Sequence, residues 1–457
     1  MGIQSINPAN GKIIKSYREH NDEAVIRKVS QTHKAWLSWR NSDFSIRSTL
    51  LINLADQLDK EKENLAQLMA YEMGKPLKEG VAEIEKCASV CNYYAEEAQG
   101  FLKDQLIKTE AAKSYVSFQP IGVILAIMPW NFPFWQVFRF LAPALMAGNC
   151  GVLKHASNVP GCALAIEKLV KNAGFPDHVF QTLMIGSKAV VKVIENPLIK
   201  AVTLTGSTEA GIKVAAQAGA LLKKTVLELG GSDAYVVLAD ADLESAAEIC
   251  ANSRLINNGQ SCISAKRFIV VKEVEKKFTS LFVEKMKQRK TGDPLEKDTN
   301  LGPMAREDLR DELHQQVLKN IELGAKCILG GQIPKLKGKH AYYVPTVLSG
   351  IKVGMPAYSE EMFGPVAAIL TAKDTEHAIK LANDTSFGLG AAIFTKNVAL
   401  GEEIARTKLQ AGSCFVNALV KSDPRLPFGG INQSGYGREL GSFGIQEFVN
   451  IKTVYVK

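Results

Sequence analysis

From residue 121 onward the chain alternates short apolar runs with helical stretches. Short runs of this kind are typical of buried parallel strands, and their alternation with helices predicts a doubly wound α/β fold. The first series of apolar runs is IGVILAIM (121–128), GVLK (151–154), FQTLMI (180–185), AVTLTG (201–206) and TVLEL (225–229). A second series follows, with DAYVVL (233–238), KRFIVV (266–271), VAAILTA (366–372), GAAIFT (390–395) and SCFVN (413–417).

The margins of this region follow other patterns. Residues 22–104 carry apolar side chains at helical spacing, with Asn21 or Asp22 as a cap and a break at Gly74. Residues 114–118 and 448–456 resemble strands that have no helix beside them. We expect both to be edge strands, which in an oligomer could pair with a partner subunit.

Composition and charge exclude several classes of protein. The 457 residues, with 46% hydrophobic and 22% charged, are ordinary for a globular chain, and this length suggests about three domains. The net charge of +8 is spread without a basic run, which favours a solvated surface and anionic small ligands over nucleic acid. The N-terminus lacks the pattern of a signal peptide, and the longest apolar run is too short to span a bilayer. We therefore expect a cytoplasmic protein without a membrane partner.

The eight cysteines indicate free thiols in a reducing compartment, because none forms a C-x-x-C pair. Cys87 and Cys91 share one face of a helix, where packing is favoured over metal binding. The histidines are scattered, and we expect no metal site. Cys262 differs from the other cysteines, since NNGQSCISAKR (257–267) is too polar for a core strand, where a buried cysteine usually lies among apolar neighbours.

Three further loops contain candidate functional groups. TLTGSTEAGIK (203–213) has a strand, a Gly-Ser-Thr turn and a helix start, which suits either a phosphate or a plain capping turn. Glu228 ends an apolar strand before two glycines, as a general base or a capping carboxylate would. Asn131 is held between Pro129 and Pro133, where its amide could stabilise an oxyanion or make local turn bonds.

Taken together, these loops indicate a site. They lie at the ends of predicted strands, the edge at which ligands bind to sheets of this type. A cysteine, a carboxylate and a fixed amide supply a nucleophile, a base for water and an oxyanion donor. This combination predicts thiol chemistry that passes through an acyl intermediate.

These residues resemble the aldehyde dehydrogenase superfamily over essentially the whole chain. The blocks that carry the resemblance occur in the family's order: PWNFP (129–133), LTGSTEAG (204–211), LELGGSDA (227–234), NNGQSC (257–262), EEMFGPV (360–366) and PFGGINQSGYGRE (427–439). Any one block is weak, but the ordered set is specific. The short N-terminus and VNALVKSDPRLPFGG (416–430) are similar to the bacterial succinate-semialdehyde dehydrogenase group.

The resemblance implies a fold of three parts. A Rossmann-like cofactor domain would comprise residues 1–104 and 121–230, and an α/β catalytic domain residues 231–430. A small β oligomerisation extension would comprise residues 105–120 and 431–457, so that we expect a homodimer or homotetramer. The extension would use the two strands at the margins.

The resemblance also implies catalytic roles. Cys262 would attack the aldehyde, while the Asn131 amide and the Cys262 backbone N–H hold the oxyanion. After hydride leaves for NAD or NADP, a thioester remains, and Glu228 would activate water to release the acid. The polar loop gives a nucleophilic cysteine the access that it needs, and Gly259 would let the backbone approach a substrate or cofactor.

Cofactor residues follow from the same resemblance, with Gly206 and Ser207 at the pyrophosphate turn. The full cofactor set is Trp130, Lys154, Ser157, Gly206, Ser207, Leu229, Glu361 and Phe363. Many NAD-preferring relatives have a Glu where this chain has Ser157. A neutral Ser beside Lys154 would accept the 2′-phosphate of NADP, although Ser157 could instead only cap the next helix.

Substrate residues are Arg139, at a position that often binds the far carboxylate of succinate semialdehyde, and Ser422. Some relatives have a second Arg at the position that Ile256 takes in this chain. Arg254 lies two residues before that position, and Arg425 could take over the binding of the carboxylate. The lead hypothesis is oxidation of succinate semialdehyde, with a broad-specificity aliphatic or aromatic aldehyde dehydrogenase as the alternative. Glu228 disfavours a CoA-acylating variant. The non-enzyme alternative, a structural or binding relative, is disfavoured by the intact Cys262, Glu228 and Asn131.

Overall fold

The first lobe is built on a six-stranded sheet. The computed structural model describes residues 2–334 and 340–457 of the chain. The strand order of this sheet is β17-β9-β8-β5-β6-β7, and every neighbouring pair is parallel except β17 and β9. The strands are β5 (Val123–Met128), β6 (Cys150–His155), β7 (Phe180–Thr182), β8 (Ile199–Thr205), β9 (Lys224–Glu228) and β17 (Gly435–Tyr436). The predicted parallel strands of the first series are therefore confirmed.

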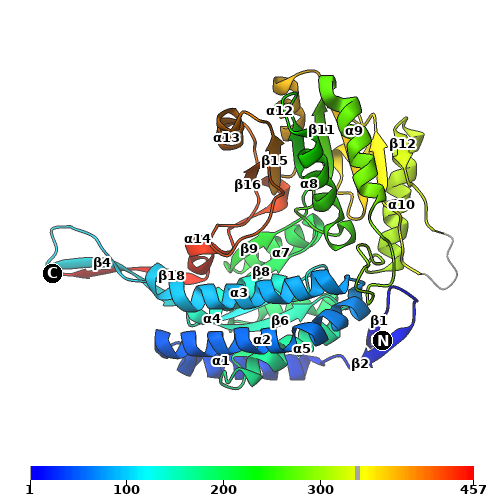
Figure 1. Ribbon diagram of the computed structural model, residues 1–457. Coiled ribbons are helices and arrows are strands. Elements are labelled where there is room, and N and C mark those ends of the chain that lie inside the picture. The colour runs from blue at the N-terminus through cyan, green and yellow to red at the C-terminus, as the bar shows by residue number, and fades with distance from the viewer. Residues whose placement is uncertain (1, 335–339) are drawn as a thin grey trace.

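Helices surround this first sheet (Figure 1). The long N-terminal helices α2 and α3 pack against each other, and α3 packs on α4. The helices are α1 (Asp22–Trp39), α2 (Phe44–Met73), α3 (Leu77–Phe101), α4 (Trp135–Met146), α5 (Pro160–Asn172), α6 (Val190–Glu195) and α7 (Thr208–Ala220), with a 3-10 turn η1 (Ser187–Ala189). Asn21 caps α1 by accepting from the N–H of Ala24, and Gly74 ends α2 in the left-handed conformation, as the sequence predicts.

The second lobe contains a seven-stranded sheet of order β12-β13-β14-β11-β10-β15-β16, with only β12 and β13 antiparallel. Its strands are β10 (Ala234–Val237), β11 (Arg267–Val271), β12 (Lys326–Leu329), β13 (Thr346–Ser349), β14 (Val366–Ala372), β15 (Gly390–Phe394) and β16 (Ser413–Val416). The helices are α8 (Leu243–Leu255), α9 (Lys272–Lys287), α10 (Glu307–Glu322), α11 (Pro356–Ser359), α12 (Thr375–Asn383) and α13 (Val398–Thr407), with a 3-10 turn η2 (Ile256–Gly259).

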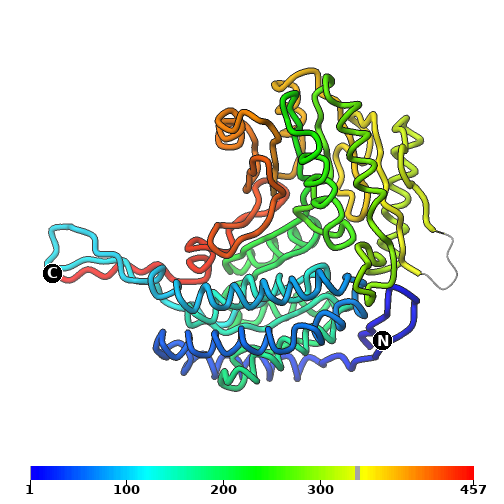
Figure 2. Tube along the Cα trace, viewed as in Figure 1, coloured from blue at the N-terminus to red at the C-terminus, as the bar shows by residue number. Residues whose placement is uncertain are grey.

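The two strands at the margins pair with each other in a projecting arm (Figure 1). The arm is a three-stranded sheet of order β18-β4-β3, so β18 is an edge strand as expected, whereas the expectation for β4 is wrong because β3 pairs with its other side. Strand β18 carries the C-terminus to the tip. The strands of the arm are β3 (Gln105–Leu106), β4 (Lys113–Pro120) and β18 (Val449–Val456), and η3 (Asn432–Ser434) and α14 (Gly441–Gln446) precede β18. Figure 2 follows the chain from the second lobe past the first sheet and out along this arm.

The chain also forms an N-terminal hairpin of β1 (Ile3–Ile6) and β2 (Ile13–Tyr17), for which the sequence analysis predicted no strand. Most of β2 is exposed, so it has no apolar pattern that would mark it as a strand. None of the helices within residues 2–334 and 340–457 is both long and apolar enough to cross a membrane.

Strand order places the functional loops together. Strands β9, β8, β5 and β6 are consecutive and parallel, so their carboxyl ends lie along one edge of the sheet. That edge carries Glu228 at the end of β9, Gly206 after β8, Asn131 after β5 and Ser157 after β6. Residues 229–233 then connect this sheet to β10 of the second lobe. The division into three functional domains stays a prediction, and β17, from the C-terminal segment, joins the first sheet.

Candidate active site

Cys262 lies in a strained loop between η2 and β11. Asn257, Asn258 and Gly259 all have positive φ, at 52°, 59° and 77°. A side chain at Gly259 would place its Cβ 2.3 Å from the carbonyl carbon of Gly364. The missing side chain of Gly259 makes room for the backbone of Gly364, and its approach to a ligand stays a prediction.

Side-chain amides tie this loop to the loop after β5. Asn257 Nδ2 donates to the backbone oxygen of Asn131 at 2.6 Å and to that of Gln260 at 3.1 Å. Asn131 Nδ2 also donates to the Gln260 oxygen at 3.1 Å. The second hydrogen of the Asn131 amide remains for another acceptor. The two lobes thus bring the amide and the thiol to the same region.

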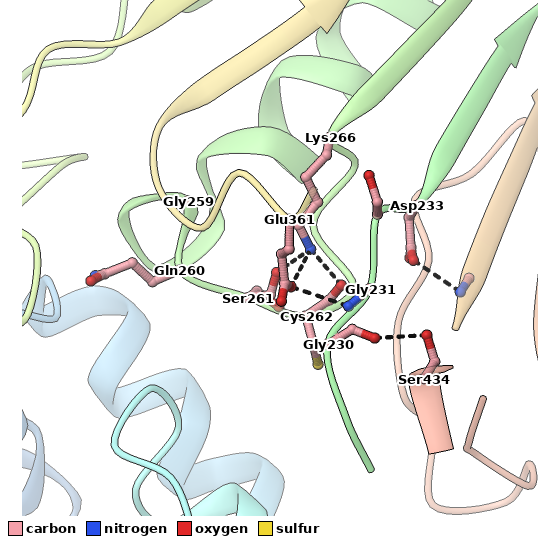
Figure 3. A network of polar contacts seen from close by, with 12 residues as sticks. Gly230, Gly231, Asp233, Gly259, Gln260, Ser261, Cys262, Lys266, Glu361 and Ser434 are labelled. Carbon is pink, nitrogen blue, oxygen red and sulfur yellow. Dashed lines mark hydrogen bonds and ion pairs between the residues drawn. The ribbon is translucent and has the colours of Figure 1, made fainter. Parts of the chain in front are cut away.

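Lys266 fixes the backbone around the thiol (Figure 3). Its ammonium donates to the oxygens of Cys262 at 2.6 Å and Ser261 at 2.8 Å, and it lies 3.1 Å from the carboxylate of Glu361. Glu361 in turn accepts from the N–H of Gly231 at 3.2 Å. This network joins the Cys262 loop of the second lobe to the link between the lobes.

Cys262 lines two cavities, of about 250 Å³ and about 260 Å³. The first, which we name the α3–α4 cavity, is lined by residues of α3 and α4, by the Cys262 loop and by residues 419–422 and 428. The second, the β8–β9 cavity, is lined by the loops after β5, β8 and β9 and by residues 309, 361 and 363. A thiol between two cavities can contact a ligand in each.

Burial controls the protonation of the thiol. It raises the pKa of Cys262 to about 12, although the cations of Lys266 and Arg139 lower it. The carboxylates of Glu361 and Glu228 act in the opposite direction and raise the pKa. Cys262 is nevertheless only partly covered, whereas Cys87, Cys91, Cys150, Cys162 and Cys250 are buried. It is thus the accessible thiol of this region.

Glu228 is a buried carboxyl at the end of β9. Its side chain is 2% exposed, and neither oxygen has a hydrogen-bond partner among the described residues. Burial raises its pKa well above the usual value; Arg139 and Arg438 lower the pKa, and Glu439 raises it. A raised pKa makes the carboxylate a stronger proton acceptor, as a general base requires.

Arg139 is committed to protein partners. Its guanidinium forms a buried ion pair with Glu439, lies 4.7 Å from the centre of the Phe428 ring, and donates weakly to Thr205 at 3.4 Å. Arg139 also lines the α3–α4 cavity. The pairing with Glu439 does not favour its predicted role as the anchor of a substrate carboxylate.

The other predicted substrate groups are divided by the structure. Ser422 and Ile256 line the α3–α4 cavity. Arg254 is buried and donates to the backbone oxygens of Ala265 and Gly259 instead. Arg425 is exposed and pairs with Asp423 at 2.7 Å. Neither arginine belongs to the lining of this cavity.

The predicted cofactor residues fall into two groups. Trp130, Gly206, Ser207, Leu229, Glu361 and Phe363 line the β8–β9 cavity. The rings of Trp130 and Phe363 meet edge to face at 5.8 Å, and Ser207 caps α7, whose first N–H groups can receive an anion. Lys154 and Ser157 line a third cavity of about 780 Å³ beside the N-terminal hairpin. We name it the N-terminal cavity.

Sequence reasoning missed several residues of the α3–α4 cavity. Glu79, Ala82, Glu83 and Lys86 all line it from one face of α3. Their spacing of three and four residues was the available signal, since it places three charged side chains on one face of a helix. Lys266 and Glu439, which hold Cys262 and Arg139 in place, were also missed. No cluster of side chains suited to a metal ion occurs in the described ranges.

Known proteins resemble the chain along its whole length. The sequence model of the aldehyde dehydrogenase family matches residues 1–454. A probable succinate-semialdehyde dehydrogenase (NADP(+)) of Synechocystis sp. is 47% identical over 456 residues, which cover 100% of both chains. A succinate-semialdehyde dehydrogenase (NADP(+)) of Mycobacterium avium is 45% identical, with 100% of this chain and 97% of that protein covered.

A solved structure agrees with these matches. The succinic semialdehyde dehydrogenase of Streptococcus pyogenes, in complex with NADP+, has a TM-score of 0.97 to this structure at 36% identity, over 99% of each chain. The resemblance seen in the sequence blocks is confirmed, and the chain belongs to the aldehyde dehydrogenase family.

Proposed function

We propose that this protein oxidises succinate semialdehyde to succinate, with NADP as the preferred hydride acceptor. The observation that carries the proposal is the position of Cys262 between the α3–α4 cavity and the β8–β9 cavity. An aldehyde in the first cavity and a hydride acceptor in the second would both contact the thiol. The named activity of the Synechocystis, Mycobacterium and Streptococcus relatives supports this substrate and this cofactor.

The side chains supply each chemical step. The Cys262 thiol loses its proton to solvent, the thiolate attacks the aldehyde carbon, and the Asn131 amide and the Cys262 N–H hold the negative oxygen. The bound nicotinamide nucleotide would accept the hydride as the oxygen returns to a carbonyl. The product is a thioester on Cys262. Glu228 then removes a proton from water, which attacks the thioester and releases the acid.

The residues fit a nicotinamide nucleotide. The capped start of α7 and the aromatic pair of Trp130 and Phe363 line the β8–β9 cavity, and Lys154 lines the N-terminal cavity. Burial lowers the pKa of Lys154, and within residues 2–334 and 340–457 no carboxylate pairs with it. The 2′-phosphate of NADP would supply the negative charge that Lys154 lacks, and it would lie beside the neutral Ser157.

A second candidate is a broad-specificity aldehyde dehydrogenase. Much of the α3–α4 cavity is apolar, with Phe132, Trp135, Ile256, Leu419 and Val420 in its lining. Such a surface would accept uncharged aliphatic or aromatic aldehydes. The same measurement separates the two candidates.

The test is a steady-state comparison of about a dozen aldehydes with NAD and with NADP, judged by kcat/KM. We expect succinate semialdehyde with NADP to give the highest value, and Ser157→Glu to shift the cofactor ratio toward NAD. Equal values for charged and uncharged aldehydes would support the broad-specificity enzyme. A wild type that strongly rejects NADP would overturn the assignment of Lys154 and Ser157.

Assembly and location belong to the same proposal. We expect a homodimer or homotetramer joined through the arm, whose exposed apolar side chains include Leu106, Ile451 and Tyr455. We also expect a cytoplasmic enzyme, because the cysteines are free, as a reducing compartment would keep them.

A further inference from the structure

The α3–α4 cavity contains a partly buried cation, Lys86, which was not among the predicted site residues. Lys86 extends from α3 into the lining, where its ammonium donates to Ser422 Oγ at 2.7 Å. The ammonium also lies 4.2 Å from the centre of the Trp135 ring. These two contacts fix the Lys86 charge on the wall of the cavity that Cys262 also lines.

Apart from the exposed Lys421, the other charges beside this cavity have partners. Arg139 pairs with Glu439, and Lys75 pairs with Glu83. Glu83 also accepts the N–H groups of Phe134 and Trp135, each at 2.9 Å, near the start of α4. The carboxyl of Glu79 accepts the N–H of Asn257 at 2.7 Å, and burial raises its pKa to about 7.

Lys86 lacks such a partner. Among the described residues no carboxylate oxygen lies within 4.0 Å of its ammonium. Burial lowers the pKa of Lys86 to about 8, and the positive charge of Arg139 acts in the same direction. A partly buried ammonium without a counter-ion is destabilised by its lost hydration, and a ligand carboxylate would offset that loss.

We infer that Lys86, together with Ser422, binds the distal carboxylate of the substrate. Ser422 accepts a hydrogen bond from Lys86, so its own hydroxyl hydrogen can point to a carboxylate oxygen. The apolar part of the lining would then contact the methylene groups between the carboxylate and the aldehyde. Lys86 would thus act as a specificity-determining residue.

This inference rests on the proposed function and names the group that selects the substrate. It also accounts for Arg139, whose ion pair with Glu439 leaves it less available than Lys86. Uncharged aldehydes of the same length would enter the apolar part but leave the ammonium without a counter-ion. Discrimination should therefore depend on the charge of the substrate's far end.

The experiment compares three substrates in the full-length enzyme with saturating NADP: succinate semialdehyde, its methyl ester and butanal. The readout is the ratio of kcat/KM for succinate semialdehyde to that for each uncharged aldehyde. We expect Lys86→Met to lower this ratio by about 10²-fold, mostly through KM, as for loss of one partner of a buried charge pair. Lys86→Arg should restore part of the ratio, because it restores the charge.

Matched variants separate binding from folding. Lys78→Met changes an exposed lysine on the same helix, outside the cavity lining, and should leave the ratio at the wild-type value. If Lys86→Met does not fold, Lys86→Gln keeps a polar end that can still bond Ser422 and should also lower the ratio. A merely structural role would lower kcat/KM for all three substrates together.

The outcomes distinguish the two proposals. A wild type that does not prefer succinate semialdehyde over its methyl ester contradicts the proposed function. A wild type that does prefer it, with a ratio unchanged in Lys86→Met and Lys86→Gln, overturns the role of Lys86 and leaves the proposed function standing.

Discussion

Burial and nearby charge set the protonation of the reacting side chains. The pKa values of Cys262 and Glu228 are both raised by burial, and Arg139 lowers both of them. Arg139 is itself held by Glu439, and Lys266, which also lowers the pKa of the thiol, is held by Glu361. A few buried ion pairs thus connect the nucleophile, the proposed base and the wall of the substrate cavity.

Replacement of Glu228 by Gln should trap the acyl-enzyme. Attack and hydride transfer do not need this carboxylate, whereas hydrolysis does, so turnover should fall by roughly 10²-fold or more. Rapid-quench mass spectrometry should show an adduct on Cys262 after one burst of NADPH.

The thiol variants provide the controls for this experiment. Cys262→Ser should show neither burst nor adduct, while Cys250→Ser, at a thiol buried in the core, should retain both. Full-speed turnover in Glu228→Gln would show that another group activates water.

The charge of Lys86 should make substrate preference depend on pH. Because its pKa is lowered to about 8, the ammonium is present below that pH and lost above it. The ratio of kcat/KM for succinate semialdehyde to that for butanal should therefore fall as the pH rises through about 8. The ratio cancels ionisations of the enzyme that affect both substrates equally. The pH dependence of kcat/KM reports the pKa values of the free enzyme.

Neighbouring groups act on the same ratio. Arg139, Glu83, Cys87 and Asp423 contribute to the field at Lys86. Glu79, with a pKa of about 7, gains negative charge over pH 6–8 and would repel the substrate carboxylate. This repulsion would also lower the ratio as the pH rises. Lys86→Arg should remove only the step near pH 8, since the guanidinium stays charged. If that step persists in Lys86→Arg, it belongs to another group.

At the scale of elements, η2 determines where Cys262 lies. Consecutive residues with positive φ turn the chain sharply after α8, and Asn258 donates to the oxygens of Gly74 and Pro303. The turn is thereby attached to the end of α2 in the first lobe. Packing and hydrogen bonds from both lobes keep this turn in its strained backbone conformation.

Gly259→Ala should destabilise the protein and lower activity. Its φ of 77° alone costs a residue with a side chain about 1–2 kcal/mol, and the close contact with Gly364 adds to that. We expect a lower Tm and a lower kcat, measured by calorimetry and steady-state kinetics. Gly219→Ala is the control: Gly219 lies in α7 with open space around it, so Ala should raise the Tm slightly. A neutral Gly259→Ala would show that the turn relaxes easily.

At the scale of the whole molecule, the arm stands apart from both lobes (Figure 1). It contacts little of its own chain, yet Ile451 is 61% exposed and Leu106 is 74% exposed. Exposed apolar side chains on a projecting sheet favour contact with another subunit.

Ile451→Asp should therefore weaken assembly. Sedimentation velocity should show a dimer or tetramer for the wild type and a shift toward monomer for the variant, because a charge would be buried in the contact. Val353→Asp is the matched control, since Val353 is similarly exposed but lies in a loop outside the arm. If Ile451→Asp sediments as the wild type does, the arm is not the contact.

The sequence by itself determined the fold class and the family, because both depend on local patterns. Apolar runs at strand length alternate with amphipathic helices, and the ordered blocks around Asn131, Glu228 and Cys262 stand on the loops that join them. The parallel strands of both sheets, except β13, and the helices before residue 104 follow these patterns. The roles assigned to the individual site residues stay predictions.

Only the tertiary structure decided which charges meet. Arg139 pairs with Glu439, from a segment 300 positions later in the chain, and Lys86 bonds Ser422 across a similar separation. No local pattern carries this information, because a buried charge takes whichever partner the packed lobes bring to it. For a related reason, the sequence did not predict the hairpin β1–β2 or the close approach of Gly259 to Gly364. Both depend on contacts between segments and not on the spacing of apolar residues within one.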